Sequence, residues 1–202
     1  MYTLYYLPDA CPLATQVVLH ELDQPVEIIN MQSVDNFSAI NPVGTVPVLV
    51  DNGTTYTEGA AVLLHLLDKH ENTMLPASGT KRKQAIENIM FANATMHPTY
   101  SRLFFIAQNI TDEKAKQSAF DAAAHSISSL WQVVEQKLAN NKYLGGDQPS
   151  AADILLAVYS RWDGSFPVTI TKGANTQKML AAVLAMPSFE RAIALEQRQS
   201  AA

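Results

Sequence analysis

The first 22 residues contain a strand, a break and a helix in close succession. Residues 2–22 read YTLYYLPDACPLATQVVLHEL, and residues 2–7 are aromatic, β-branched or aliphatic, which is typical of a strand. Residues 8–10 interrupt this pattern. Cys11 then precedes Pro12, a residue well suited to the first position of a helix, and apolar residues at helical spacing follow. The sequence therefore predicts a strand, a helix beginning at Pro12, and Cys11 directly at the start of that helix.

Another strand, a hairpin and a second helix follow. Residues 26–29 are a short strand-like run, and residues 47–50 and 54–57 flank the turn Asp51-Asn52-Gly53. Asn-Gly between two strand-like runs is a strong hairpin signal. The next residues, 58–70, have the apolar spacing of a helix. The first 70 residues thus predict the order strand, helix, strand, hairpin, helix.

After about residue 70 the strand signals stop. Residues 72–80 contain Pro76, Ser78 and Gly79, as expected of a linker. The remaining apolar patterns are helical and cover residues 81–108, 112–139, 176–185 and 188–196. Pro98 should kink the first of these helices. We expect a first domain over residues 1–72 and an all-helical domain over residues 80–202.

One further helix start is marked by polar residues. Ser150 and Asp153 are three positions apart and stand just before the apolar residues 154–156. This is the spacing of a capping box, with Asp in place of the usual Glu or Gln. We expect Asp153 to accept a hydrogen bond from the Ser150 N–H, so that its role is structural.

Composition excludes several classes of protein. Apolar residues make up 48% and charged residues 16% of the chain, which argues against disorder. The net charge of -5 argues against nucleic acid as a partner. No apolar run approaches the ~18 residues of a membrane span, and the N-terminus does not resemble a signal peptide. The single cysteine cannot form an internal disulfide, so we expect a cytoplasmic protein without membrane contact. We expect no metal site.

The charge is unevenly distributed along the chain. Residues 1–68 contain eight acidic residues and neither Lys nor Arg, and the first basic residue is Lys69. All fourteen Lys and Arg residues lie in residues 69–202. This change in composition supports a domain boundary near residue 70. It also means that an anionic ligand of the first domain finds no basic side chain within residues 1–68.

Four motifs in this order resemble those of bacterial glutathione transferases, especially the cysteine-containing, beta-like class. They are residues 6–14, 41–49, 57–61 and 145–153. The resemblance covers nearly the whole chain and implies an α+β, thioredoxin-like N-terminal domain followed by an all-helical C-terminal domain. It also implies glutathione as co-substrate and a homodimer with the two long helices at its interface.

Cys11 is the first candidate for a catalytic residue. Unpaired N–H groups and the dipole at a helix N-terminus favour a thiolate, so we expect a low pKa for Cys11. A thiolate could form a mixed disulfide with glutathione or hydrogen-bond to the glutathione sulfur. The alternative is an inert, buried cysteine. A dithiol mechanism within one subunit is excluded because the chain has no second cysteine.

The resemblance assigns glutathione-binding roles to four further positions. It implies a cis bond between Val46 and Pro47, with the Val46 backbone pairing with the cysteinyl unit of glutathione. Glu58 would hold the γ-glutamyl ammonium group, and the Gly59 N–H, at a helix start, would meet its carboxylate. The alternatives are a proline at a strand entry and a favourable charge in the first turn of a helix.

Other candidates come from both predicted domains. The resemblance places an active-site histidine at His97, and Tyr100 shares its helix face. Tyr6, on the strand before Cys11, is expected to form a wall of the glutathione site rather than to donate a proton. Three aromatic residues could line an apolar pocket or pack in the core; they are Phe91, Phe104 and Trp162.

Because residues 1–68 offer no cation, a cation for glutathione must come from the helical domain or from a partner subunit. Arg102 and Arg161 are the candidates. We expect an enzyme with transferase or thiol-disulfide activity on small apolar electrophiles or disulfides, with detoxification as its role. The rival hypothesis is a non-catalytic binding or regulatory protein with the same fold, because a fold does not determine function.

Overall fold

The computed structural model describes residues 1–200. Its contacts divide the chain into two compact units. The first comprises residues 1–82 together with the chain from residue 184 onward, and the second comprises residues 83–183. The expected domain limits of 72 and 80 remain a prediction, but the contacts group the last helix with the first unit.

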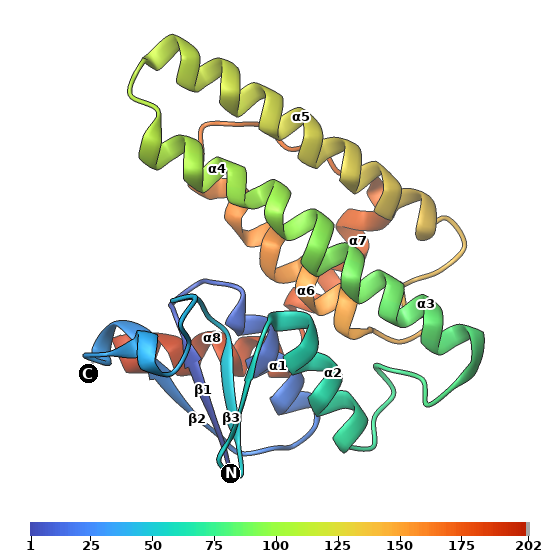
Figure 1. The fold of residues 1–202 in the computed structure, drawn as a ribbon. Helices are drawn as coiled ribbons and strands as arrows, with labels where there is room; N and C mark the ends of the chain where they lie inside the picture. The colour runs from blue at the N-terminus through green and yellow to red at the C-terminus, as the bar shows by residue number, and fades with distance from the viewer. Residues whose placement is uncertain (201–202) are drawn as a thin grey trace. The chain divides into compact units, whose positions relative to one another are not determined.

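The described residues of the first unit form a mixed sheet of four strands in the order β2-β1-β3-β4 (Figure 1). The strands are β1 (Tyr2–Tyr6), β2 (Val26–Asn30), β3 (Val48–Asp51) and β4 (Thr54–Thr57). β1 is parallel to β2 and antiparallel to β3, which pairs antiparallel with β4. The predicted hairpin is present, and Asn52 and Gly53 both have positive φ, at 49° and 82°. This conformation is the reason that Asn-Gly suits a two-residue turn.

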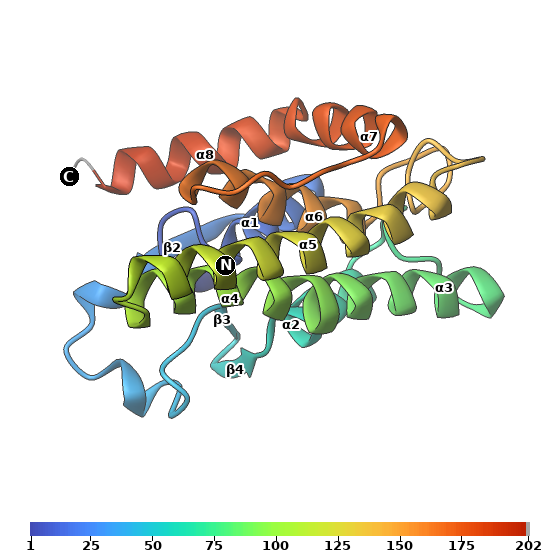
Figure 2. The same ribbon diagram turned by 90° about the horizontal axis from the view of Figure 1, so that it is seen from above.

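Three helices belong to the first unit. α1 (Pro12–Glu21) and α2 (Gly59–Lys69) pack against each other and against strands of the sheet, and α8 (Pro187–Ser200) packs on α1 (Figures 1 and 2). Short 3-10 turns at Met31–Ser33 and Phe37–Ala39 lie in the loop after β2. The core of the unit is apolar, and its fully buried side chains include Leu4, Leu13, Val17, Leu49 and Val62. The thioredoxin-like fold expected for the first domain is confirmed.

The second unit is helical. Its elements are α3 (Gly79–Met90), which begins at the end of the first unit, α4 (His97–Asn109), α5 (Glu113–Lys137), α6 (Ala151–Ser160), a 3-10 turn (Arg161–Ser165) and α7 (Ala174–Leu184). α4 and α5 lie side by side (Figures 1 and 2). The all-helical prediction is confirmed. No helix of the described residues is long and apolar enough to cross a membrane.

The helix predicted for residues 81–108 is interrupted by a π turn, Phe91–Met96, between α3 and α4. Pro98 follows within the first turn of α4. A proline inside a helix lacks an N–H, and its ring collides with the carbonyl four residues earlier, here Ala94. The wider π turn accommodates this collision, so the irregularity lies just before the proline instead of forming a simple kink.

Carboxylates cap helices of the second unit, among them α6 and α7. The predicted capping box at the start of α6 is confirmed, and Asp153 accepts hydrogen bonds from Ser150 N at 2.8 Å and Ser150 Oγ at 2.6 Å. Glu135 of α5 caps α7 from outside that helix. It accepts from Asn175 N at 3.1 Å and from Thr176 N at 2.8 Å. These hydrogen bonds hold the pKa of Glu135 below its usual range.

Candidate functional site

Cys11 occupies the connection between β1 and α1. It is the residue before Pro12 at the start of α1, and its side chain is half-buried. The Cys11 thiol lies 3.5 Å from the carbonyl oxygen of Val46, to which it donates a weak hydrogen bond. The bond between Val46 and Pro47 is cis, as the resemblance implies. The fold thus brings together three of the predicted site residues, Cys11, Val46 and Pro47.

The prediction of a low pKa for Cys11 is wrong. Burial raises the pKa of the Cys11 thiol to about 11, and a hydrogen bond with the backbone only partly opposes this rise. Burial disfavours a thiolate because the charged form loses its hydration. The hydrogen bond that the thiol donates to Val46 also belongs to the protonated form. Cys11 is therefore a neutral thiol near pH 7.

Glu58 and Gly59 lie at the start of α2. Glu58 has φ 67° and ψ 114°, a rare conformation for a residue other than glycine, and its side chain is exposed. Such strained residues are concentrated at functional sites. The helix begins at Gly59, and the first N–H groups of a helix have no acceptor within it. The structure thus places an exposed carboxylate beside N–H groups that suit an anion.

Tyr6 is the last residue of β1 and is 1% exposed. Burial and the nearby carboxylate of Glu196 raise the pKa of Tyr6. A raised pKa makes the phenol a weaker acid, which agrees with the expectation that Tyr6 does not donate a proton. Glu196 was not among the sequence-based candidates.

His97 begins α4 in the helical unit, within a cluster of aromatic rings. Its ring centroid lies 5.1 Å from that of Tyr159 and 5.6 Å from that of Trp162, both edge to face. Burial lowers the pKa of His97, so its imidazole is neutral near pH 7. Phe104 lies 5.5 Å from Trp162 in the same cluster. Tyr100, which shares the His97 face, is buried and donates a hydrogen bond to Asp163 Oδ1 at 2.7 Å.

Comparison with known proteins identifies the family. Residues 7–74 match the family model of the glutathione S-transferase N-terminal domain, and residues 92–177 match that of the C-terminal domain. Glutathione S-transferase GST-4.5 of Xanthomonas campestris pv. campestris is 34% identical over 166 residues, which are 79% of this chain and 81% of that protein. The chain belongs to the glutathione S-transferase family.

Solved structures of the family have the same fold. A glutathione S-transferase from Xylella fastidiosa is 25% identical and superposes with a TM-score of 0.88, covering 98% of this chain and 99% of that chain. A sphingomonad glutathione S-transferase complexed with glutathione is 26% identical with a TM-score of 0.84, covering 96% of this chain and 98% of that one.

The two arginines named as possible cations for this family member both lie in the helical unit. Arg102 is exposed on α4, and Arg161 is half-buried at the end of α6. In the first unit, Lys69 forms an ion pair with Asp51 at 2.5 Å, and Asp51 also pairs with His65 at 2.8 Å. Lys69, the basic residue closest in sequence to the N-terminal motifs, therefore already forms an ion pair with Asp51.

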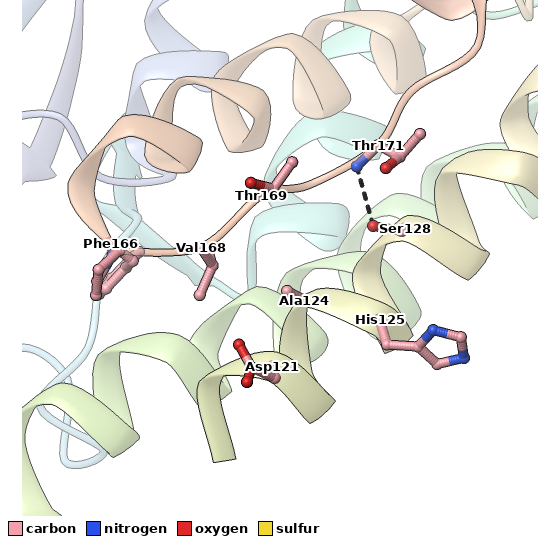
Figure 3. Close-up of a pocket in the computed structure, with 9 residues that line it drawn as sticks. Asp121, Ala124, His125, Ser128, Phe166, Val168, Thr169 and Thr171 are labelled. Atoms are coloured by element: carbon pink, nitrogen blue, oxygen red, sulfur yellow. Dashed lines mark hydrogen bonds between the residues drawn. The ribbon is translucent and has the colours of Figure 1, made fainter. Parts of the chain in front are cut away.

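The helical unit also contains a cavity of about 650 Å³ that the sequence did not predict. It lies between α5 and residues 166–171, and Ser128 accepts a hydrogen bond from Thr171 N at 3.0 Å across it (Figure 3). The imidazole of His125 points away from residues 166–171 (Figure 3). The α5 residues that line the cavity have the spacing of an ordinary solvent-exposed helix face. The sequence alone therefore could not indicate a cavity at this place.

Proposed function

We propose that the protein transfers glutathione to a small apolar electrophile, with the sulfur of glutathione as nucleophile and Cys11 as a hydrogen-bond donor to that sulfur. The observation that carries the proposal is the position of the Cys11 thiol at the start of α1, against the backbone of Val46 that precedes cis Pro47. The resemblance assigns this backbone to the cysteinyl unit of glutathione. Relatives named glutathione S-transferases support a transferase-like enzyme.

The protonation state of Cys11 supports conjugation over thiol-disulfide exchange. In thiol-disulfide exchange, the attacking group is a thiolate, and its fraction decreases as the pKa rises above the ambient pH. Burial raises the pKa of Cys11 to about 11, so almost no thiolate exists at neutral pH. A protonated Cys11 can instead donate a hydrogen bond to a glutathione thiolate. We therefore place reduction of disulfides second.

We assign the γ-glutamyl end of glutathione to the start of α2. The exposed carboxylate of Glu58 suits the ammonium group, and the N–H of Gly59 suits the carboxylate. A structure named as a sphingomonad glutathione S-transferase complexed with glutathione supports glutathione as the ligand. The apolar co-substrate is the class that the resemblance implies.

The test is calorimetric titration of glutathione together with two activity assays. One assay follows conjugation of an activated aryl halide, and the other follows reduction of a mixed disulfide by glutathione. Cys11→Ser should keep conjugation within a few-fold, because a hydroxyl also donates a hydrogen bond. Cys11→Ala should lower conjugation more strongly. If the wild type reduces the disulfide and Cys11→Ser does not, disulfide reduction and not conjugation would be the main activity, and the proposal would be overturned.

Affinity for glutathione is expected to be weak, because backbone N–H groups supply only partial charge. Arg102→Ala and Arg161→Ala test whether a helical-domain cation contributes; a full cation would add about 1.5–3 kcal/mol. Lys178→Ala, an exposed cation of α7, is the matched control. Tight binding that neither arginine variant weakens would refute the charge argument. No binding by the wild type would favour the non-catalytic alternative.

We also propose a homodimer in the cytoplasm, with detoxification as its role. Large apolar side chains that are exposed on the long helices support self-association; Phe105 is 63% exposed, Met90 42% and Val133 38%. Light scattering after gel filtration would measure the mass. Phe105→Glu should favour the monomer, while Gln132→Glu, at an exposed polar position of α5, should not.

A further inference from the structure

The C-terminal helix α8 carries a buried carboxylate, Glu196, which is 5% exposed. Its two oxygens accept different donors. Oε1 accepts from Nε2 of Gln16, a fully buried residue of α1, at 2.6 Å. Oε2 accepts from the backbone N–H of Asp9, two residues before Cys11, at 3.0 Å. Glu196 therefore connects α8 to both sides of Cys11.

Glu196 lies on a face of α8 that carries buried apolar side chains. Phe189 and Ala192 lie seven and four residues earlier on the same face of the helix, and both are 0% exposed. A carboxylate in such surroundings loses its hydration and is tolerated only where hydrogen bonds replace it. A leucine would serve packing alone at this position. The carboxylate thus indicates a role beyond holding α8 in place.

The segment that Glu196 contacts is a tight turn. Asp9 has φ 57°, a left-handed conformation that is uncommon for residues other than glycine, and Ala10 N donates to Leu7 O at 3.2 Å across the turn. Inside this turn the Asp9 N–H points to the Glu196 carboxylate. The same carboxylate raises the pKa of Tyr6, on the opposite side of the turn, so its charge lies close to both ends of the turn.

We propose that Glu196 is a positioning residue for Cys11. From α8 it holds the turn of residues 7–10, and thereby fixes the Cys11 thiol against the Val46 carbonyl. Gln16 supports the carboxylate from the first turns of α1, on the other side of Cys11. The proposal rests on contacts within the protein alone, so it holds whether or not glutathione is the ligand.

The neighbourhood of Gln16 provides a conservative variant. Oε1 of Gln16 is buried and has no hydrogen-bond partner within residues 1–200. In Glu196→Gln, the new amide oxygen can still accept from Asp9 N. Rotation of the Gln16 amide by a half-turn then presents Oε1 to the new NH2 group. This variant removes the charge but keeps the hydrogen bonds with Asp9 N and Gln16, whereas Glu196→Ala removes these two hydrogen bonds.

The experiment measures two properties of the folded protein, neither of which requires glutathione. One is the hydrogen-exchange rate of the Asp9 amide, and the other is the alkylation rate of Cys11 by iodoacetamide at a single pH. Glu196→Ala should raise both rates about tenfold or more, because a hydrogen bond to a charged group is lost and the turn loosens. Glu196→Gln should return both to within about threefold of the wild type. Gln197→Ala, at the exposed neighbouring position of α8, is the matched control and should change neither.

Unchanged rates in folded Glu196→Ala would overturn the proposal. Rates in Glu196→Gln as high as in Glu196→Ala would also overturn it, because the hydrogen bonds would then not be what holds the turn. Should Glu196→Ala fail to fold, Glu196→Asp replaces it: the carboxylate is withdrawn by one methylene, and the same rise in both rates is expected. Normal rates in folded Glu196→Asp would contradict the positioning role.

Discussion

Asp153→Ala should destabilise the helical unit more than the loss of an ordinary helix cap. The Asp153 carboxylate is 0% exposed and accepts three hydrogen bonds, from Leu144 N at 2.9 Å, Ser150 N at 2.8 Å and Ser150 Oγ at 2.6 Å. It therefore joins the loop before α6 to the first turn of α6. Loss of a simple N-cap costs about 0.5–2 kcal/mol.

The magnitude follows from the donors that the substitution leaves behind. Two backbone N–H groups lose their acceptor, and each unsatisfied buried donor costs about 1–3 kcal/mol. Ser150 Oγ can turn to another acceptor, so we count nothing for it. Part of this cost is offset because the burial of the carboxylate, which raises the pKa of Asp153, is relieved. We expect a net loss of about 2–4 kcal/mol, and a fall in Tm of about 5–15 °C for a chain of this length.

Urea denaturation followed by circular dichroism gives the free energy of unfolding, with an unchanged m-value as the check that the denatured state is comparable. Asp147→Ala, at an exposed position of the same loop, is the control and should lie within about 0.5 kcal/mol of the wild type. Asp153→Asn keeps one oxygen acceptor and should fall between the two. A loss below about 1 kcal/mol in Asp153→Ala, together with lost activity, would refute the structural role.

Three further predictions follow from single contacts. Gly173→Ala should lower the free energy of unfolding by about 1–3 kcal/mol in denaturant titrations, because the added Cβ would overlap the Glu135 carboxylate that caps α7. The control is Gly164→Ala, where an added Cβ meets nothing within 4 Å. An equal loss of stability in both variants would contradict the prediction. The hydrogen bond from Lys69 lowers the pKa of Asp51 in the folded protein below its unfolded value of about 3.9. The stability that Asp51 contributes is therefore fully present above the unfolded pKa, and it is lost as the pH falls through the folded pKa. Asp51→Asn should therefore be less stable than the wild type at pH 7 and converge with it as the pH falls below the folded pKa of Asp51. A stability difference independent of pH would disprove the ion-pair origin. Alkylation of Cys11 should accelerate about tenfold per pH unit from pH 7 to 10, and a plateau below pH 8 would contradict the raised pKa.

Local signals in the sequence predicted local structure well. The hairpin at Asn52 and Gly53 and the capping box at Ser150 and Asp153 depend on neighbouring residues, and both are present. Pro98 indicated an irregularity at the right place but not its form, because the structure has a π turn just before it instead of a simple kink. In each case the residues that determine the conformation are within a few positions of each other, so spacing and residue type were sufficient to locate the feature.

The properties of the site depended on contacts distant in sequence and could not be predicted in the same way. The helix start at Pro12 correctly placed Cys11, but its pKa follows from burial by the folded unit, which outweighs the helix terminus. Glu196 contacts Asp9 across 187 positions, and at the sequence level it is one polar residue in an amphipathic helix. Its spacing from Phe189 and Ala192 places Glu196 on the apolar face of α8, unlike the exposed Glu190, but spacing does not identify its partners.

The raised pKa of Cys11 also determines which sulfur can act as nucleophile. Forming a thiolate at pH 7 from a thiol with a pKa of about 11 costs about 5 kcal/mol, at about 1.4 kcal/mol per pKa unit. A free thiol with a pKa of about 8.5 requires only about 2 kcal/mol. The sulfur of glutathione is therefore easier to ionise than Cys11 by about 3 kcal/mol, even before the protein contributes any stabilisation. In the conjugation that we propose, the single S–H of Cys11 turns from the Val46 carbonyl and donates a hydrogen bond to the glutathione thiolate as it forms, which requires the Cys11 thiol to stay protonated. Burial of Cys11, which opposes its own reactivity, thus fits the conjugation that we propose.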